Sequence, residues 1–496
     1  MVRFVRVAAL LALAFAFVGC GAKNEASSSM PAGADFAPAS SVVYVTGVTD
    51  PSSSQWQKAQ ALLGRFPGSD KLLADARKDL AKDGLSWEQD VKPALGEEID
   101  LVLLSYEDAD HSYVFFTKPK NEAKFDKLLE SGGPEDRQVH TKIDGWTVFA
   151  DNQKSLDNFA AAHAAGGSLS GEDAFEDAMR GLPEDSALRG YVAGKPINDL
   201  IRKEAAKDPD TQAFKSFSDS FGELKYISFS SSAEDEGVAF RAGYSSTKST
   251  EAGSYDAELD GTLPSGALAY ISFGDLEQYF DRTLSTVGKE SPEFDKQLEQ
   301  FQKALGFDLK DDLLPLFSKE GAIAVYNGGD EAIPSVLFAL RVDDEDKAMK
   351  LIDRLAAFAG LADIDVRPLS LQGATGKTFS YPEESLTIYA VVGDGKVFVS
   401  NSRARIEDAL GDGSKLSDDA VYKEALEASS APDETSGFVY ANLKLTLPLL
   451  FGSVHSFTTG SVPPDVRGYI APLRSAVLYT KQDGGQTTVS GFVTIK

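Results

Sequence analysis

The sequence predicts an α+β fold made of two homologous repeats, each a largely antiparallel sheet covered by helices. Two observations lead to this prediction. The order of segments in residues 36–247 returns in residues 262–496, which indicates a tandem duplication. Strand-like runs also follow one another through short turns, without regular alternation of single strands and helices, which favours antiparallel pairing. We expect the helices to cover one face of each sheet, with a cleft between the repeats or between sheet and helices.

Each repeat opens with a proline and a buried strand. The segments "FAPASSVVYVTGV" and "TLPSGALAYISFGD" place Pro38 against Pro264 and Tyr44 against Tyr270. Their runs of Val, Ala and Tyr are typical of buried strands. Amphipathic helices are predicted next in both repeats, at 54–66 and 69–84 in the first and at 276–288 and 291–306 in the second.

The correspondence continues to the C-terminus. Both repeats end in a predicted hairpin, "LKYISFSSSAEDEGVAFRAGYS" in the first and "LRSAVLYTKQDGGQTTVSGFVT" in the second. The polar residues 248–261 between the repeats are the predicted linker. Further matched pairs occur in the same order along both repeats: Asp90 and Asp312, Pro93 and Pro315, Glu98 and Glu320, Phe149 and Phe398, Phe175 and Tyr422, Gly190 and Gly437.

Residues 1–20 have the three parts of a secretion signal. Arg3 and Arg6 give a positive start, residues 7–18 are an unbroken apolar run, and a small residue, Gly19, precedes Cys20. The apolar run is too short to span a bilayer, which needs about 20 residues. We therefore expect an exported protein whose signal is removed.

The end of the signal, Phe17-Val18-Gly19-Cys20, resembles the lipobox of bacterial lipoproteins. This resemblance implies that the Cys20 sulfur carries a diacylglyceryl group that holds the protein to the membrane of the cell envelope. Two acyl chains suffice for stable anchoring, whereas one does not. Residues 21–35 are then a flexible tether. An ordinary cleaved signal with an incidental cysteine is the alternative.

Composition and charge limit the classes of function. The formal charge of −27 repels phosphate backbones and anionic lipid head groups, so we expect no nucleic-acid partner. Membrane contact then has to come from the lipid on Cys20. Because Cys20 is the only cysteine among the 496 residues, the chain has no disulfide and no other thiol nucleophile.

Three segments also resemble a known family. "PASSVVYV", "RFPGS" and "DVKPALGEEIDLVL" are similar to a bacterial family of exported proteins, the domain of unknown function numbered thirty-three fifty-two. The resemblance covers nearly all of residues 36–496, in two copies. The family has no established activity, so it implies no functional residues. The second copy departs from the pattern, with Ser318 near the position equivalent to Gly96.

Candidate sites are few. Asp108, Asp110 and His111 have side chains that can bind a metal. The equivalent segment of the second repeat, "YNGGDEAIPSV", lacks the histidine. A solvated hairpin tip is therefore favoured, and we predict no metal site. "GATGKTF" at 373–379 ends like a P-loop but has Leu371 where the motif needs glycine, and it is predicted to be strand, turn, strand. Trp87 and Trp146 are the aromatic residues considered for a groove, although core packing is the favoured role.

No catalytic arrangement emerges from these motifs. Our leading hypothesis is a non-catalytic, lipid-anchored envelope protein that binds or scaffolds an extracytoplasmic partner, and we expect no cofactor. One alternative is a carrier or chaperone for an apolar ligand such as a lipid. The other is an envelope hydrolase that uses paired carboxylates, since acidic residues are too plentiful for a pair to be excluded by counting.

Overall fold

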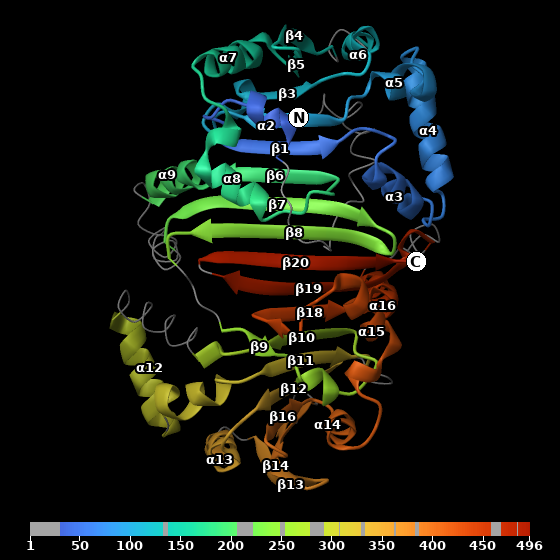
Figure 1. Ribbon diagram of the computed structural model, residues 1–496. Coiled ribbons are helices and arrows are strands. Elements are labelled where there is room, and N and C mark those ends of the chain that lie inside the picture. Colours follow the sequence, from blue (N-terminus) through green and yellow to red (C-terminus); the bar gives the residue numbers. More distant parts are fainter. Residues whose placement is uncertain are drawn as a thin grey trace. The chain divides into compact units, whose positions relative to one another are not determined.

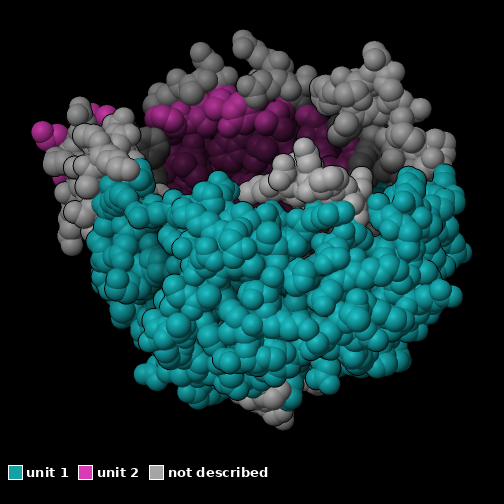
Figure 2. All heavy atoms as spheres, turned by 90° about the horizontal axis from the view of Figure 1, so that it is seen from above, with its two compact units in different colours: residues 1–250, 460–474, 483–496 teal, residues 251–459, 475–482 magenta. Residues whose placement is uncertain are grey.

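The computed structural model describes residues 30–131, 137–205, 222–248, 253–277, 292–306, 308–328, 333–361, 364–381, 386–457, 468–483 and 485–496 (Figure 1). The predicted signal, Cys20 and residues 21–29 of the predicted tether lie outside these residues. The chain divides into two compact units, which Figure 2 colours separately. Unit 1 contains residues 1–250, 460–474 and 483–496, and unit 2 contains residues 251–459 and 475–482.

The sheet of unit 1 is antiparallel throughout. Its strands alternate in direction across the sheet, and the order of neighbours differs from the order in the chain. In the order in which neighbours pair they are β4 (Val139–Ile143), β5 (Trp146–Ala150), β3 (Tyr113–Thr117), β2 (Glu98–Leu103), β1 (Val43–Val48), β6 (Leu188–Ala193), β7 (Leu224–Glu234), β8 (Gly237–Ser246) and β20 (Gln486–Ile495).

The helices of unit 1 connect these strands. They are α2 (Ala32–Phe36), α3 (Ser54–Leu63), α4 (Ser69–Lys82), α5 (Lys92–Ala94), α6 (Glu122–Leu129), α7 (Gln153–Ala164), α8 (Asp173–Arg180) and α9 (Gly194–Ala205). Short helical turns are η2 (Trp87–Val91), η3 (Ala109–His111) and η4 (Leu169–Gly171).

Helices cover both faces of the unit 1 sheet, so the expectation of one covered face was wrong. The physical reason is the alternation of side chains along a strand. Phe116 points into the core that α2, α7 and α8 close with residues such as Phe159. Its neighbour Phe115 points to the opposite face, where α6 closes a second core with Phe125. Both faces carry large apolar side chains, and each needs a cover.

Unit 2 has a sheet of the same kind. Its neighbours in order are β13 (Asp365–Leu371), β14 (Ala374–Tyr381), β15 (Leu386–Gly393), β16 (Lys396–Ser400), β12 (Ser335–Arg341), β11 (Gly321–Tyr326), β10 (Ala269–Phe273), β18 (Gly437–Ala441) and β19 (Leu473–Asp483). A separate pair joins β9 (Tyr255–Asp256) to β17 (Glu434–Thr435). All these pairings are antiparallel.

Helical segments fill the connections of unit 2. They are α12 (Pro292–Leu305), α13 (Glu345–Leu361), α14 (Arg403–Leu410), α15 (Ala420–Ser429) and α16 (Leu443–Phe457), with the short turns η6 (Leu259–Gly261), η7 (Leu309–Leu313), η8 (Leu314–Phe317) and η10 (Leu416–Asp418). The predicted α+β fold class with largely antiparallel sheets is confirmed in both units. Within the described ranges, every helix is too short or too polar to cross a bilayer.

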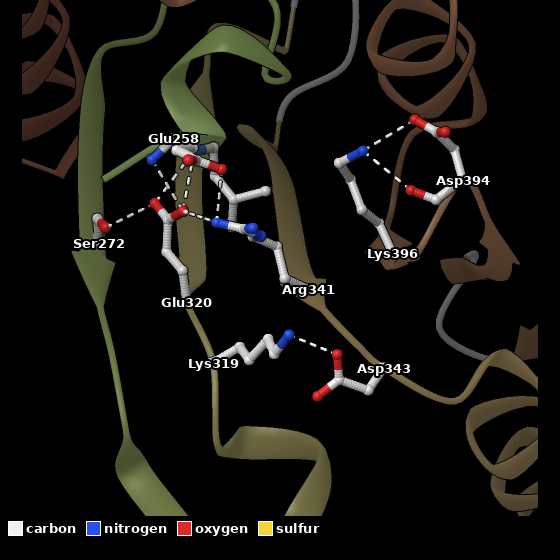
Figure 3. A network of polar contacts seen from close by, with 9 residues as sticks. Glu258, Ser272, Lys319, Glu320, Arg341, Asp343, Asp394 and Lys396 are labelled. Carbon is white, nitrogen blue, oxygen red and sulfur yellow. Dashed lines mark hydrogen bonds and ion pairs between the residues drawn. The ribbon is translucent and has the colours of Figure 1, made fainter. Parts of the chain in front are cut away.

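Equivalent hydrogen bonds occur in the two units. In unit 1 the backbone amide of Gly33 donates to Glu98 Oε1 at 2.9 Å. In unit 2 the amide of Leu259 donates to Glu320 Oε1 at 3.1 Å. Figure 3 shows the Glu320 carboxylate between Ser272 and the segment that carries Glu258. Glutamates paired in the sequence thus hold the start of each unit in the same way.

The prolines at the start of each repeat also have equivalent contacts. Pro38 forms a β-bridge to Ser168, and Pro264 forms one to Lys415. Directly beside these bridges, Leu169 N donates to Ala37 O at 2.9 Å and Leu416 N donates to Leu263 O at 2.8 Å. A duplicated sequence therefore produces duplicated local structure in the two units.

The limits of the units differ from the expected ranges 36–247, 248–261 and 262–496. The division at residues 250 and 251 falls inside the expected linker. Residues 483–496, expected in the second repeat, group with unit 1 because β20 pairs along the whole of β8. Unit 2 also contains the β13–β14 hairpin, which has no counterpart among the described strands of unit 1.

Candidate functional site

An apolar pocket of about 200 Å³ lies in unit 1. Its walls come from α3, from α4, from the turn η2 with α5, and from the ends of β7, β8 and β20 (Figure 1). Most of the side chains that line it are apolar: Pro51, Trp56, Ala59, Leu62, Leu63, Phe66, Leu73, Ala76, Leu80, Trp87, Ala233, Val238 and Ile495. Gln60, Arg77, Glu88 and Lys92 add polar groups.

The floor of the pocket is a small buried core. Leu62 and Phe66 at the end of α3 pack with Val238 of β8 and Ile495 of β20. Arg65 fixes this contact, since its guanidinium donates to the carbonyl oxygens of Ile495 and Asp235. The C-terminal strand is therefore part of the pocket as well as of the sheet.

Two tryptophans form one wall. Trp56 lies on α3 and Trp87 on η2, and their rings stack with centroids 6.0 Å apart and planes 14° apart. Both side chains are half-buried. Stacked indoles present a large apolar surface, and aromatic pairs contribute about 0.5–1.5 kcal/mol beyond the area that they bury.

Local capping sets the position of each indole. Ser53 begins α3, and its hydroxyl accepts from the Trp56 amide at 3.2 Å. On η2 the Asp90 carboxylate accepts from the Ser86 amide at 2.8 Å. A hydrogen bond from Lys127 lowers the pKa of Asp90, so this cap stays ionised at neutral pH. Such caps stabilise a helical start by about 1 kcal/mol.

Helix α4 closes the pocket from outside. Leu73, Ala76, Arg77 and Leu80 line the pocket, and their spacing places them on one face of the helix. Only Ser69 and Leu80 of this helix are buried. Glycines with left-handed backbone conformations lie on both sides of α4, Gly68 with φ 84° and Gly84 with φ 71°.

A second cavity of about 40 Å³ lies deeper in unit 1. Leu80 and Trp87 line both cavities. The remaining lining comes mainly from the core under α6, including Phe125, Leu128 and Phe149. The side chains of Leu80 and Trp87 therefore separate the outer pocket from an apolar inner space.

The predicted candidate residues lie elsewhere. Asp108, Asp110 and His111 are at η3, between β2 and β3, where His111 Nδ1 lies 2.7 Å from Asp108 Oδ1. Lys154 binds the other Asp108 oxygen at 3.0 Å, and hydrogen bonds from His111 and Lys154 lower the pKa of Asp108. Among the described residues, no group of three or more His, Cys, Asp or Glu side chains is arranged to hold a metal ion.

The other sequence candidates divide between core and pocket. Trp146 is 5% exposed and stacks on Phe36 in the core, the role favoured for it. Trp87 lines the pocket. The segment with Gly373 and Lys377 is the β13–β14 hairpin, as predicted, and not the strand–helix junction of a P-loop.

A buried polar cluster in unit 1 is a second chemically unusual place. The Tyr44 hydroxyl donates to Asp100 Oδ1 at 2.6 Å, while Oδ2 of this fully buried carboxyl has no hydrogen-bond partner among the described residues. Burial, with the charge of Glu98, raises the pKa of Asp100 to about 8. Burial also lowers the pKa of Arg189 nearby. These residues line neither cavity described above.

Fold and pocket together define a duplicated α+β protein with an apolar pocket in its first unit. A family model described as "Protein of unknown function (DUF3352)" matches residues 4–133 and 127–492. The chain belongs to this family, and the resemblance noted in the sequence is confirmed. A comparison with curated proteins gave no match.

Solved structures with some likeness to the chain include two crystal forms of a protein named TP0453. Crystal form I matches with a TM-score of 0.23 and 9% sequence identity, over 45% of this chain and 82% of that chain. Crystal form IV matches with a TM-score of 0.20 and 9% identity, over 47% of this chain and 92% of that chain.

Proposed function

We propose that the protein is a lipid-anchored envelope protein that binds the acyl chain of a lipid in unit 1, without catalysis. The outer pocket is the observation that carries this proposal. Its volume of about 200 Å³ exceeds that of an apolar cavity of about 150 Å³ that binds benzene. The pocket can therefore take several methylene groups, each of which gains about 0.8 kcal/mol on leaving water.

The construction of the pocket supports a binding role. Its floor is held by the Arg65 hydrogen bonds, and its aromatic wall is held by the caps at Ser53 and Ser86. The outer wall, α4, buries little of its own surface and lies between Gly68 and Gly84. A rigid floor with one lightly packed wall is a suitable arrangement for admitting a ligand.

The anchor at Cys20 supports the choice of ligand. A diacylglyceryl group on this residue would keep unit 1 close to a membrane, where acyl chains are the abundant apolar molecules. The protein would then be a carrier or chaperone for lipid, and the extracytoplasmic partner would be the lipid itself.

Mass spectrometry of organic extracts tests this function. Protein purified from the envelope without added detergent is extracted as the wild type, as Ala76→Phe and as Ala74→Phe. Ala76 lines the pocket, so a phenyl ring there fills it, whereas Ala74 is exposed on the same helix and serves as the matched control. We expect lipid with the wild type and Ala74→Phe and its loss from Ala76→Phe. Equal lipid in all three, or none in the wild type, would overturn the proposal.

A further inference from the structure

The face of α4 that closes the pocket carries one charged side chain. Leu73, Ala76 and Leu80 occupy three of the four positions of this face, and Arg77 occupies the fourth. An arginine in an apolar stripe is unusual because its guanidinium needs hydrogen-bond acceptors. Within the described part of the chain, Arg77 forms no ion pair and no side-chain hydrogen bond.

Three ion pairs join other charged side chains of α4 and of the pocket. Lys92 lies 3.6 Å from Glu88 at the pocket. On the helix itself, Lys78 pairs with Asp75 at 3.0 Å, and Lys82 pairs with Asp79 at 2.6 Å. Among the described residues, Arg77 is therefore a free cation at an apolar site, in a chain whose formal charge is −27.

We propose that the pocket selects an amphiphile with an anionic head group, namely the carboxylate of a fatty acid, which Arg77 binds at the pocket mouth. This inference rests on the function proposed above. The apolar stem of Arg77 can lie along the stripe with Leu73 and Ala76, while its guanidinium reaches the water. A guanidinium binds a carboxylate through two parallel hydrogen bonds. Because Arg77 holds the carboxylate at the pocket mouth, the acyl chain enters the pocket tail first.

The charge of the head group can change the affinity only modestly. Arg77 is exposed, and exposed ion pairs contribute about 0.2–1 kcal/mol. We therefore expect the charged head group to raise affinity by up to about fivefold over an uncharged analogue with the same chain. The acyl chain supplies most of the binding free energy, because apolar area is what the pocket buries.

Tryptophan fluorescence of the full chain can measure this difference. The protein has three tryptophans, and Trp146→Phe leaves only Trp56 and Trp87, both in the pocket wall. This variant is titrated at neutral pH, below micelle formation, with dodecanoate, dodecanol and dodecylamine. We expect dodecanoate to bind more tightly than dodecanol, by up to about fivefold, and dodecylamine to bind most weakly.

Two further substitutions assign the effect to Arg77. Arg77→Gln should make dodecanoate and dodecanol bind equally. Lys78→Gln makes the same change of charge at the next residue of the helix, away from the pocket stripe, and should preserve the difference. If dodecanol binds as tightly as dodecanoate before these substitutions, or if dodecylamine binds best, the head-group inference is wrong and the binding function stands. If none of the three binds, the proposed function itself fails.

Discussion

Trp56 and Trp87 stack in one wall of the pocket although α4 separates them in the chain, with ring centroids 6.0 Å apart and planes 14° apart. The contact joins α3 to η2, and Trp87 of η2 also packs against the core that lies under α6. Trp87 lines the inner cavity as well as the outer pocket. The pair therefore supports unit 1 and also forms part of the pocket wall.

Trp87→Ala should destabilise unit 1. The substitution enlarges both cavities and removes the ring stack, and for a half-buried tryptophan we expect a loss of about 2 kcal/mol in the free energy of unfolding. Trp56→Ala, which also removes the stack but enlarges only the outer pocket, should cost less. Urea denaturation followed by circular dichroism measures both values, and equal midpoints for wild type and Trp87→Ala would contradict the role of the stack.

Asp100 should make stability depend on pH. In the unfolded chain an aspartate has a pKa of about 3.9, whereas burial raises the pKa of Asp100 to about 8 in the folded protein. Between these two values the unfolded state loses the proton and the folded state keeps it. The free energy of unfolding therefore falls as the pH rises from about 4 to about 8, by at most about 1.4 kcal/mol per pH unit.

Asp100→Asn tests this pH dependence, because an amide does not titrate but still offers Oδ1 to the Tyr44 hydroxyl. Urea unfolding at several pH values in this window should show a shallower decline for the variant than for the wild type. The same slope in both proteins would show that Asp100 is ionised in the fold.

Glu320 and Glu258 give a matched comparison in unit 2, since both lie near Arg341. Glu320 is 2% exposed and accepts from the buried amide of Leu259, so Glu320→Ala leaves that donor unsatisfied and should cost about 1–3 kcal/mol. Glu258 is largely exposed, and Glu258→Ala should cost less than about 1 kcal/mol. Thermal unfolding of both variants measures the two losses of stability. A larger loss for Glu258→Ala than for Glu320→Ala would contradict this prediction.

Cys20→Ala should release the protein from the membrane. Without the thiol there is no site for a diacylglyceryl group, and the apolar run of the signal is too short to serve as an anchor. Fractionation of cells that express each form measures this directly, with Ser27→Ala in the predicted tether as a neutral control. If Cys20→Ala remains in the membrane fraction, the anchor is something other than the lipid.

Part of the fold could be predicted from the sequence because the duplication repeats residues with strong local roles. Pro38 and Pro264 form equivalent β-bridges, and Glu98 and Glu320 accept equivalent hydrogen bonds from backbone amides. A glutamate at the start of an apolar strand recurs in the second repeat, and it is one of several matched pairs that occur in the same order in both repeats.

The pocket could not be predicted, because its walls are far apart in the chain. Trp56 and Ile495 line the same pocket because β20 pairs with β8. The sequence predicts a C-terminal hairpin but does not indicate which strand its last strand pairs with. Trp87 was considered for a groove, but Trp56 was not. The pattern of Leu73, Ala76 and Leu80 on a predicted helix with little other apolar surface was the available signal.

The most direct test of the central claim is a titration with an uncharged apolar probe. N-phenyl-1-naphthylamine, whose fluorescence rises in apolar surroundings, is added to wild type, Ala76→Phe and Ala74→Phe. The pocket predicts saturable binding to the wild type and to Ala74→Phe, with at least a tenfold loss of affinity in Ala76→Phe, about 1.4 kcal/mol. Identical binding curves for all three proteins, or no binding to the wild type, would contradict the assignment of ligand binding to this pocket.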